Sequence, residues 1–188
     1  MAESYNLSEQ DELIISLERN QALEIIMNSY GNEIKRLIYT YVKNEADTDD
    51  IAQEVFVTVY KKLHTFQKQS SLKSWLYSIA INKSKDYLRS WQVRNRNLMK
   101  RITREKKIKQ PNLKSIEHRV VKDEENRKLI TQIMELPLKY REVIILYYFN
   151  DFSTREISNI TKVKDATIRT RLRRARERLK QNIDGERG

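Results

Sequence analysis

Residues 152–180 of this chain read FSTREISNITKVKDATIRTRLRRARERLK. The stretch opens with an S-x-x-E capping box formed by Ser153 and Glu156, and Phe152 stands before it as the expected hydrophobic residue. This signature predicts that a helix begins here. The helical pattern is interrupted over residues 162–165, so we expect this first helix to be short and to end in a tight turn.

A second helical period follows the turn and is rich in arginine. Its apolar residues recur at spacings of four, three and four, which predicts one narrow buried stripe: Ile168, Leu172, Ala175 and Leu179. Basic residues follow both flanks of that stripe, with Arg169, Arg173, Arg176 and Lys180 on one side and Arg171, Arg174 and Arg178 on the other. This pattern favours a helix-turn-helix whose second helix enters a DNA major groove, over a solvated basic helix without a ligand.

Charge is distributed unevenly along the chain. The 188 residues carry a net charge of +11, which favours a polyanionic partner. Residues 1–63, however, contain twelve acidic and six basic residues, whereas residues 94–122 contain two acidic and eleven basic ones. Residues 164–180 contain two acidic and eight basic residues. This asymmetry predicts that nucleic acid contacts some surfaces while another surface contacts something else.

Several residue types are too scarce for common kinds of site. There is no cysteine, which excludes disulfides and thiolate metal sites, and only three glycines occur, at positions 31, 185 and 188. A phosphate-binding loop needs clustered glycines, so nucleotide-dependent chemistry is disfavoured. His64 and His118 have no partner at metal-ligand spacing, and we expect neither a cofactor nor a metal. No signal peptide or membrane-length apolar run is present, so we expect a cytoplasmic protein without membrane insertion.

Helical periodicity runs through almost the whole chain, and strand signals are nearly absent. We therefore expect an all-α protein with two small helical domains joined by a flexible basic linker. Before the helix-turn-helix, helices are expected at residues 8–20, 22–43, from Asp47 or Thr48 to about Leu63, 72–91, 123–135 and 138–150. The expected domains are a tail with a short helix (1–20), a first helical domain (21–93), the linker (94–122, containing Pro111), a second helical domain (123–184) and a short tail (185–188).

The third predicted helix carries an unusual polar face. Its buried face is expected to hold Ile51, Val55 and Val59, while Asp50, Gln53, Glu54 and Val57 gather on another face. Three interpretations remain open at this point. The acids could simply stabilise the helix N-terminus; they could bind a divalent metal, although no distant carboxylate partner is evident; or they could dock a basic groove of another protein, which Val57 favours mildly.

The helix at residues 72–91 combines aromatic and polar residues on one stripe. Trp75 and Ile79 continue into Asn82 and Asp86 at helical spacing. Aromatic side chains interleaved with basic ones are able to stack on unpaired bases while neutralising phosphates. For most individual aromatic residues here, packing in the core is the favoured interpretation.

Two pairs of segments resemble a known family. The segments DDIAQEVF (49–56) and FQKQSSLKSWLYSIAINKSKDYLR (66–89) resemble region 2 of bacterial sigma factors of the extracytoplasmic-function (ECF) group. The segments LPLKYREVIILYYFNDFSTREIS (136–158) and TIRTRLRRARERL (167–179) resemble region 4 of the same group. Both motifs occur in the family's order and cover most of the chain outside the N-terminal tail and the linker.

The resemblance implies a non-enzymatic promoter-specificity subunit of RNA polymerase. By this likeness, the residues that dock on the β′ clamp helices of core polymerase are Asp49, Asp50, Gln53 and Glu54. The loop that receives a base flipped from the −10 element contains Phe66, Gln67, Lys68, Ser70, Ser71 and Lys73, with Asn82, Asp86 and Arg89 in support. Helices between Asp123 and Asn150 would grip the polymerase β flap.

The same likeness assigns the −35 element to the arginine-rich helix. The expected base contacts come from Lys164, Thr167, Arg169, Thr170 and Arg171, whereas Arg173, Arg174 and Arg176 hold phosphates or guanine edges. In the linker, Lys106, Lys107 and Lys109 are expected to contact template strand or nascent RNA. Members of the family are commonly silenced by an anti-sigma factor, often membrane-anchored, and such a partner is expected here as well.

The turn of the helix-turn-helix departs from the family pattern. Lys162 stands where glycine is usual, and a lysine adopts the left-handed conformation only at some energetic cost. Lys164 replaces the usual small hydroxyl cap, and Asp165 is the candidate that takes over capping.

Two other functions compete with the sigma factor. One is a stand-alone helix-turn-helix regulator that dimerises on a palindromic site. The other is a recombinase or nuclease that uses the acids between Asp47 and Glu54 with magnesium, for which no second acidic cluster is evident.

Overall fold

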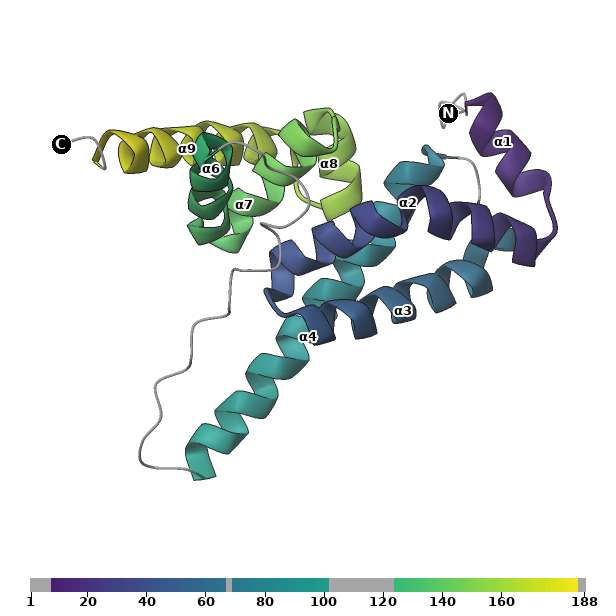
Figure 1. Cartoon of the computed structure of the whole chain (residues 1–188), viewed down its shortest axis with the longest axis horizontal. Helices are drawn as coiled ribbons and strands as arrows, with labels where there is room; N and C mark the ends of the chain where they lie inside the picture. The colour runs from purple at the N-terminus through teal and green to yellow at the C-terminus, as the bar shows by residue number, and fades with distance from the viewer. Residues whose placement is uncertain (1–7, 67–68, 102–123, 186–188) are drawn as a thin grey trace. The chain divides into compact units, whose positions relative to one another are not determined.

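A computed structural model describes residues 8–66, 69–101 and 124–185, and within these ranges every regular element is a helix (Figure 1). The elements are α1 (Glu9–Ser16), α2 (Arg19–Val42), α3 (Glu45–Lys62), the short 3-10 helix η1 (Leu63–Thr65), α4 (Leu72–Arg101), α6 (Glu124–Glu135), α7 (Leu138–Ile144), the π-helical turn η3 (Ile145–Phe149), α8 (Thr154–Thr161) and α9 (Asp165–Gly185). They form two compact units, residues 1–110 and 111–188. The predicted all-α, two-domain fold is therefore confirmed.

In the first unit, α2, α3 and α4 pack on one another around a shared apolar core. Fully buried side chains from all three helices form it: Ile34, Ile38, Val55, Val59, Leu76 and Ile81. Burial of each such aliphatic side chain contributes about 1.5–3 kcal/mol. Ile51, Val55 and Val59 make up the buried face of α3, as predicted. The opposite faces of these helices are left for other contacts.

The break between the first two helices lies a few residues earlier than the sequence predicted. Ser8 caps α1 by accepting a hydrogen bond of 3.1 Å from the Asp11 amide, and α1 ends at Ser16. Leu17 is extended, with φ −74° and ψ 162°, and α2 begins at Arg19. The two helices predicted at residues 8–20 and 22–43 are therefore both present, but the break between them lies at residues 17–18 instead of residue 21, because neither glycine nor proline marks this change of direction.

Two helix boundaries of the first unit also differ from the prediction. The cap of α3 is Asn44, whose side chain accepts a 3.0 Å hydrogen bond from the Asp47 amide, rather than Asp47 or Thr48. Helix α4 continues to Arg101 instead of ending near residue 91. Apolar periodicity marks only the part of a helix that packs on a core, and polar residues of fair helix propensity extend it further. The rest of the predicted linker, with Lys106, Lys107 and Lys109, lies outside the described residues.

The second unit is built from the remaining helices around a core of its own. Its buried side chains include Ile133, Val143, Leu146, Ile157, Ile168 and Ala175. The single helix expected at 138–150 changes from α7 into the π-helical η3, a wider turn of a kind that is frequent at functional sites. The Phe152 amide closes this corner by donating a 3.1 Å hydrogen bond to the Leu146 carbonyl.

Candidate protein and nucleic-acid interfaces

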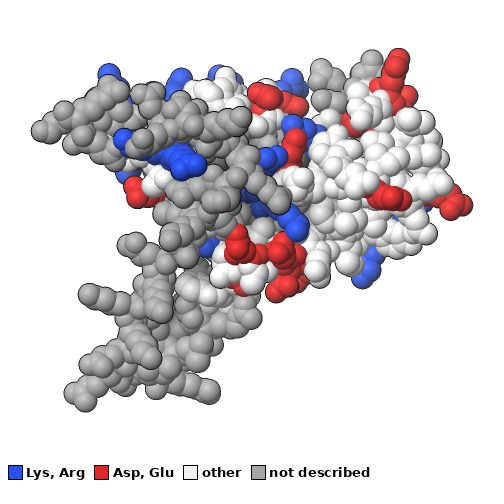
Figure 2. Space-filling model, viewed as in Figure 1, with Lys and Arg blue, Asp and Glu red and all other residues white. Residues whose placement is uncertain are grey.

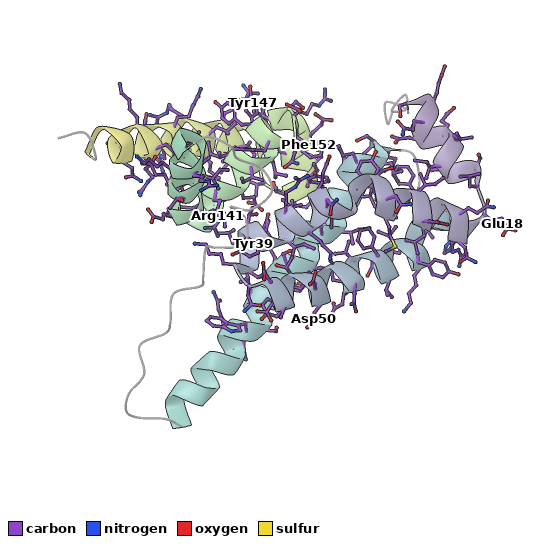
Figure 3. The ribbon with its side chains drawn as sticks, in the orientation of Figure 1. Glu18, Tyr39, Asp50, Arg141, Tyr147 and Phe152 are labelled. Carbon is purple, nitrogen blue, oxygen red and sulfur yellow. The ribbon has the colours of Figure 1, made fainter. Side chains whose placement is uncertain are left out.

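The acidic face of α3 is exposed to solvent. All four predicted polymerase-contacting side chains lie on it: Asp49, Asp50, Gln53 and Glu54. Asp50 projects outward from the helix (Figure 3), and acidic side chains gather at the surface near the start of α3 (Figure 2). Asp49 forms a 2.7 Å ion pair with Lys35 of α2, and Glu54 forms a 3.1 Å ion pair with Lys83 of α4. Both pairs are exposed and hence weakly held, so they are able to open for a partner.

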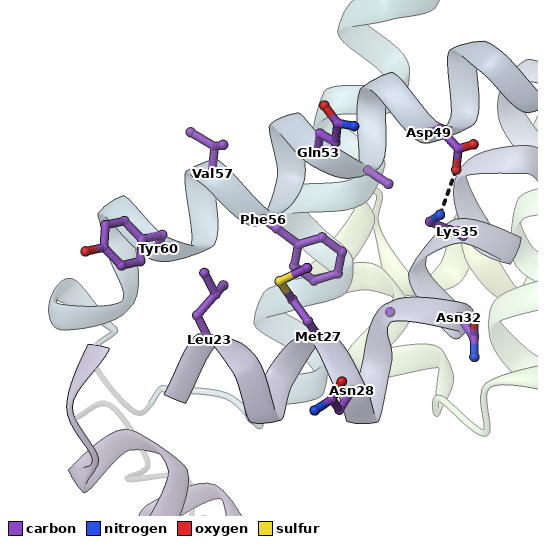
Figure 4. Close-up of a pocket in the computed structure, with 12 residues that line it drawn as sticks. Leu23, Met27, Asn28, Asn32, Lys35, Asp49, Gln53, Phe56, Val57 and Tyr60 are labelled. Atoms are coloured by element: carbon purple, nitrogen blue, oxygen red, sulfur yellow. Dashed lines mark ion pairs between the residues drawn. The ribbon is translucent and has the colours of Figure 1, made fainter. Parts of the chain in front are cut away.

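An open groove of about 990 Å³ runs beside this face, between α2 and α3. Its apolar lining comes from Leu23 and Met27 of α2 and from Phe56 and Tyr60 of α3. Figure 4 shows Met27 pointing toward Phe56, while Val57 points away from the bundle and is 52% exposed. Acidic groups beside exposed apolar ones are the pattern of a docking surface for a protein with basic and apolar side chains.

The predicted −10 loop is anchored at both of its described ends. At its start, the rings of Phe66 and Trp75 lie 5.2 Å apart and are tilted by 48°. At its end, Ser71 caps α4 by accepting a 3.1 Å hydrogen bond from the Ser74 amide. Ser70 is half-buried, whereas Gln67 and Lys68 lie outside the described residues.

Lys73 lies in the first turn of α4 within a small polar cluster. Its ammonium is 3.7 Å from the Glu33 carboxylate and 5.8 Å from the centre of the Tyr77 ring. The Tyr77 hydroxyl donates a 2.9 Å hydrogen bond to Glu33. Burial, followed by that hydrogen bond, raises the pKa of Tyr77 well above its usual value, so the hydroxyl remains a donor. Sequence reasoning missed Glu33, because α2 showed no signal beyond its apolar periodicity.

Further along α4, the predicted stripe runs from the core to the surface. Trp75 and Ile79 are half-buried, whereas Asn82 and Asp86 are exposed. The Arg89 guanidinium pairs with the Asp86 carboxylate on the outside of the helix. The three supporting residues therefore lie on an accessible surface of the same helix that begins at the loop.

The helix-turn-helix has the local chemistry expected from its sequence. Ser153 accepts a hydrogen bond from the Glu156 amide while Glu156 accepts one from the Ser153 amide, which confirms the capping box. Helix α8 ends at Thr161, and the next residue, Lys162, adopts φ 59° and ψ 32° and so supplies the left-handed turn without glycine. The predicted buried stripe of α9 is confirmed for Ile168, Leu172 and Ala175, whereas Leu179 is only half-buried.

Asp165 is the first residue of α9 and not its cap. The carbonyl of Lys164 accepts from the amides of Thr167 and Ile168, so Lys164 stands immediately before the helix and the prediction that Asp165 caps it was wrong. A hydrogen bond from Thr154 of α8, followed by one from Arg169, lowers the pKa of the Asp165 carboxyl below its ordinary value. Asp165 therefore links the first turns of the two helices.

The two basic flanks of α9 have different surroundings. Arg169 pairs with Asp165, Arg173 lies 2.5 Å from Glu177, and both arginines are exposed, as is Arg176. On the other flank, the Arg171 guanidinium lies 3.8 Å from the buried Glu142 carboxylate of α7. Lys164, Thr167 and Thr170 are exposed at the start of the helix. The predicted −35 residues are thus exposed, except for Arg171, which is half-buried.

Tyr140 of α7 contacts Arg174 and Arg178, the other two arginines on the same flank of α9 as Arg171. The Arg178 guanidinium lies 5.1 Å from the centre of its ring, and Arg174 hydrogen-bonds its hydroxyl. Burial raises the pKa of Tyr140, but the Arg174 hydrogen bond and the charges of Lys139 and Arg178 outweigh it and lower the pKa overall. Tyr140 and Glu142 were not singled out by sequence reasoning, because their partners lie some thirty residues away.

A second groove, of about 430 Å³, lies in this unit among α6, α7, η3 and α9. Leu129 and Ile133 contribute from α6, and Tyr148 and Phe149 from the π-helical turn. Phe149 is 51% exposed. Most of its lining comes from the segment between residues 123 and 150 that was predicted to grip another protein, and Arg176, Leu179 and Lys180 of α9 complete it.

The described ranges, residues 8–66, 69–101 and 124–185, offer neither a metal site nor a membrane-spanning helix. There, no group of three or more histidine, aspartate or glutamate side chains is placed to hold a metal ion. In the same ranges, no helix is both long enough and apolar enough to cross a membrane.

Two families of known proteins match separate parts of the chain. The Sigma-70 region 2 family matches residues 26–94, and the Sigma-70 region 4 family matches residues 126–179. The ECF RNA polymerase sigma factor SigW of Bacillus subtilis (strain 168) is 31% identical over 166 residues, which cover 84% of this chain and 87% of SigW. The ECF RNA polymerase sigma-E factor of Escherichia coli (strain K12) is 30% identical over 167 residues, covering 87% of each chain.

Solved structures share the fold at lower identity. CnrH, in complex with the cytosolic domain of CnrY, has a TM-score of 0.66 at 18% identity and covers 94% of this chain and 99% of its own. RpoE from Bartonella quintana, in complex with the anti-sigma factor NepR, has a TM-score of 0.65 at 21% identity and covers 88% and 96%. The presence of both sigma regions in one chain argues against a stand-alone helix-turn-helix regulator. The chain belongs to the extracytoplasmic-function group of RNA polymerase sigma factors.

Proposed function

We propose that this sigma factor attaches to core RNA polymerase through the acidic face of α3 and holds the promoter at two points. The observation that carries the proposal is the presence, in one chain, of an exposed acidic helix face in one unit and an exposed arginine-rich helix in the other. Asp49, Asp50, Gln53 and Glu54 would meet basic residues of the β′ clamp helices, and the neighbouring groove would take an apolar side chain of the polymerase. The exposed aromatic groove of the second unit would receive the β flap.

The −10 element would be recognised as a single strand at the start of α4. A flipped base needs a pocket with a stacking surface, and the Phe66–Trp75 pair lies at the start of the loop. Lys73 supplies a cation there, and Asn82, Asp86 and Arg89 continue the accessible surface along the helix. The chain itself carries out no chemical step on DNA. Strand opening is driven by tighter binding to the open form than to the duplex.

The −35 element would be read as duplex by the first turns of α9. The base edges would be contacted by four exposed residues at the start of the helix: Lys164, Thr167, Arg169 and Thr170. The exposed Arg173 and Arg176, further along the helix, would contact phosphates. A helix anchored by its Ile168–Ala175 stripe presents these groups without rearrangement.

A second protein partner is expected to control access to these surfaces. RpoE from Bartonella quintana, which shares the fold, was solved in complex with the anti-sigma factor NepR. We infer that an anti-sigma factor also binds this chain, and that the chain acts in the cytoplasm where polymerase and promoter DNA are found. The acidic face and the two apolar grooves are the surfaces that such a partner would cover.

The test is transcription by the reconstituted complex. The purified chain is mixed with core polymerase and a promoter library, and initiated transcripts are sequenced. Transcripts that start downstream of a shared pair of elements support the proposal. Tight palindromic binding by the chain alone, without transcripts, would favour a stand-alone regulator, and magnesium-dependent strand cleavage would favour a nuclease.

A further inference from the structure

A buried carboxylate connects α1 to the first residue of α4. The Asp11 side chain is 6% exposed, and its Oδ2 accepts a 3.1 Å hydrogen bond from the Leu72 amide. The two residues are 61 positions apart in the chain. An aspartate is seldom buried to this degree unless its charge is matched by a specific donor, and here the donor is the buried backbone amide of the first residue of α4.

This contact completes the N-terminus of α4. The first amides of a helix have no partner within the helix and need acceptors from elsewhere. Ser71 satisfies the Ser74 amide at 3.1 Å, and Asp11 satisfies the Leu72 amide. The negative charge of Asp11 is further stabilised by the helix dipole at this end. Helix α1 therefore takes part in capping α4.

A second carboxylate holds the same turn from another side. Glu33 of α2 accepts the Tyr77 hydroxyl at 2.9 Å and lies 3.7 Å from the Lys73 ammonium. Burial first, and then the charges of Asp11 and Glu33, raise the pKa of Tyr30. Both carboxylates therefore lie close enough to Tyr30 to influence the same side chain. The start of α4 is thus fixed by one acid from α1 and one from α2.

We propose that Asp11 is a positioning residue for recognition of the −10 element. It does not touch DNA. It fixes the Leu72 amide, and through it the orientation of Ser70, Ser71 and Lys73, which end the loop assigned above to the flipped base. This inference rests on the proposed function, and it adds that α1 contributes to promoter opening rather than to attachment of the polymerase.

Hydrogen exchange tests the contact itself. In the full chain, Asp11→Ala should accelerate exchange of the Leu72 amide at least about tenfold, the effect of losing a hydrogen bond to a charged acceptor. Amides in the middle of α3 should keep their exchange rates. The matched control is Glu9→Ala, which removes an exposed acid from the same helix and should leave Leu72 unchanged. Unchanged exchange of Leu72 in Asp11→Ala would overturn the inference.

Binding by the holoenzyme tests the consequence. With core polymerase and a fork-junction DNA that exposes the −10 strand, Asp11→Ala should bind about tenfold more weakly. Affinity for core polymerase and for a −35 duplex should stay within about twofold. Asp11→Asn keeps an acceptor oxygen and should remain within about threefold of wild type, so a full loss in this variant would count against the hydrogen bond as the cause.

Three further outcomes bear on this inference and on the function on which it rests. A wild-type holoenzyme that fails to bind the −10 strand would overturn both. A wild type that binds it, together with an Asp11→Ala variant that binds equally well, would overturn only the role of Asp11. An equal loss of core binding in Asp11→Ala would show that α1 supports the whole bundle, and would also overturn it.

Discussion

The Arg171 guanidinium of α9 lies 3.8 Å from the Glu142 carboxylate of α7, and the Glu142 side chain is only 4% exposed. An arginine predicted to read DNA is therefore turned toward its own domain. Arg174 and Arg178, on the same flank, both contact Tyr140 of α7. This flank contacts α7 of its own domain, and the exposed Arg169, Arg173 and Arg176 of the opposite flank are the arginines proposed to meet the promoter.

Arg171→Ala should thus act on stability more than on base recognition. Removing the guanidinium leaves a buried carboxylate without this partner, and we expect the free energy of unfolding of the second unit to fall by about 1–2 kcal/mol. Denaturant unfolding followed through amide signals of α7 and α9 measures this. Arg173→Ala, at an exposed pair, should cost less than about 0.5 kcal/mol. Equal stability of the two variants would contradict the anchoring role of Arg171.

Base recognition is instead expected from the exposed flank. Arg169→Ala should weaken binding of the holoenzyme to its −35 element by about 1–3 kcal/mol and relax the preference at one base pair. Arg176→Ala should weaken binding to all sequences alike and reduce the salt dependence by about one phosphate contact. Competition binding against a set of single-base promoter variants, at several salt concentrations, separates the two effects. A specificity change in Arg176→Ala without any change in Arg169→Ala would reverse these assignments.

Charge reversal on α3 should detach the chain from polymerase. Asp50→Lys places a cation opposite the expected basic partner, and we expect core affinity to drop about a hundredfold or more. Binding of the −35 duplex should not change, because α9 belongs to the other unit. Glu24→Lys, at an exposed position of α2, makes the same change in net charge and serves as the control. The docking proposal fails if both reversals weaken core binding to the same extent.

The left-handed lysines offer a direct test of backbone strain. Lys162 has φ 59° and Lys43 has φ 54°, and each ends a helix where glycine would carry no steric cost. Lys162→Gly and Lys43→Gly should each raise the free energy of unfolding by about 0.5–1 kcal/mol. The same replacement at Lys61, inside α3, should lower it by about 1 kcal/mol. Thermal unfolding of the three variants gives the comparison, and destabilisation by all three would refute the strain argument.

Acid should loosen the helix-turn-helix through Asp165. Its folded pKa is lowered, first by the Thr154 hydrogen bond, so the folded state binds the proton more weakly than the unfolded state. The stabilisation is therefore present above the unfolded value of about 3.9 and is lost as the pH falls through the lowered folded pKa. An NMR titration of Thr154→Val should show the Asp165 pKa moving up toward the unfolded value. If that pKa stays where it is in wild type, Thr154 is not its cause.

Local signals were enough for much of this molecule. The Ser153–Glu156 capping box joins residues three positions apart, so its letters alone specify the start of α8. The α9 stripe of Ile168, Leu172 and Ala175 follows in the same way from helical spacing. The family resemblance added a role for the acidic face of α3, which its residues alone left undecided.

Features that depend on distant partners could not be predicted. Nothing near Asp11 in the sequence indicates that it meets Leu72, and nothing near Arg171 indicates Glu142. Since the helical period fixes which flank a residue occupies but not what the rest of the fold places there, Arg171 was assigned to DNA. The end of α4 was placed too early for a related reason, because the apolar pattern stops near Trp91 while the helix continues to Arg101.

Helix α4 contains 30 residues, and at 1.5 Å per residue it is about 45 Å long. Under the proposed function, the turn held by Asp11 and Glu33 would act as the pivot of this length. A tilt of about 5° at that pivot would move the far end by about 4 Å, close to the rise of a DNA base pair. The two carboxylates near the pivot would then set which step of the promoter strand meets the helix, so that a loose first turn would appear as an error of register.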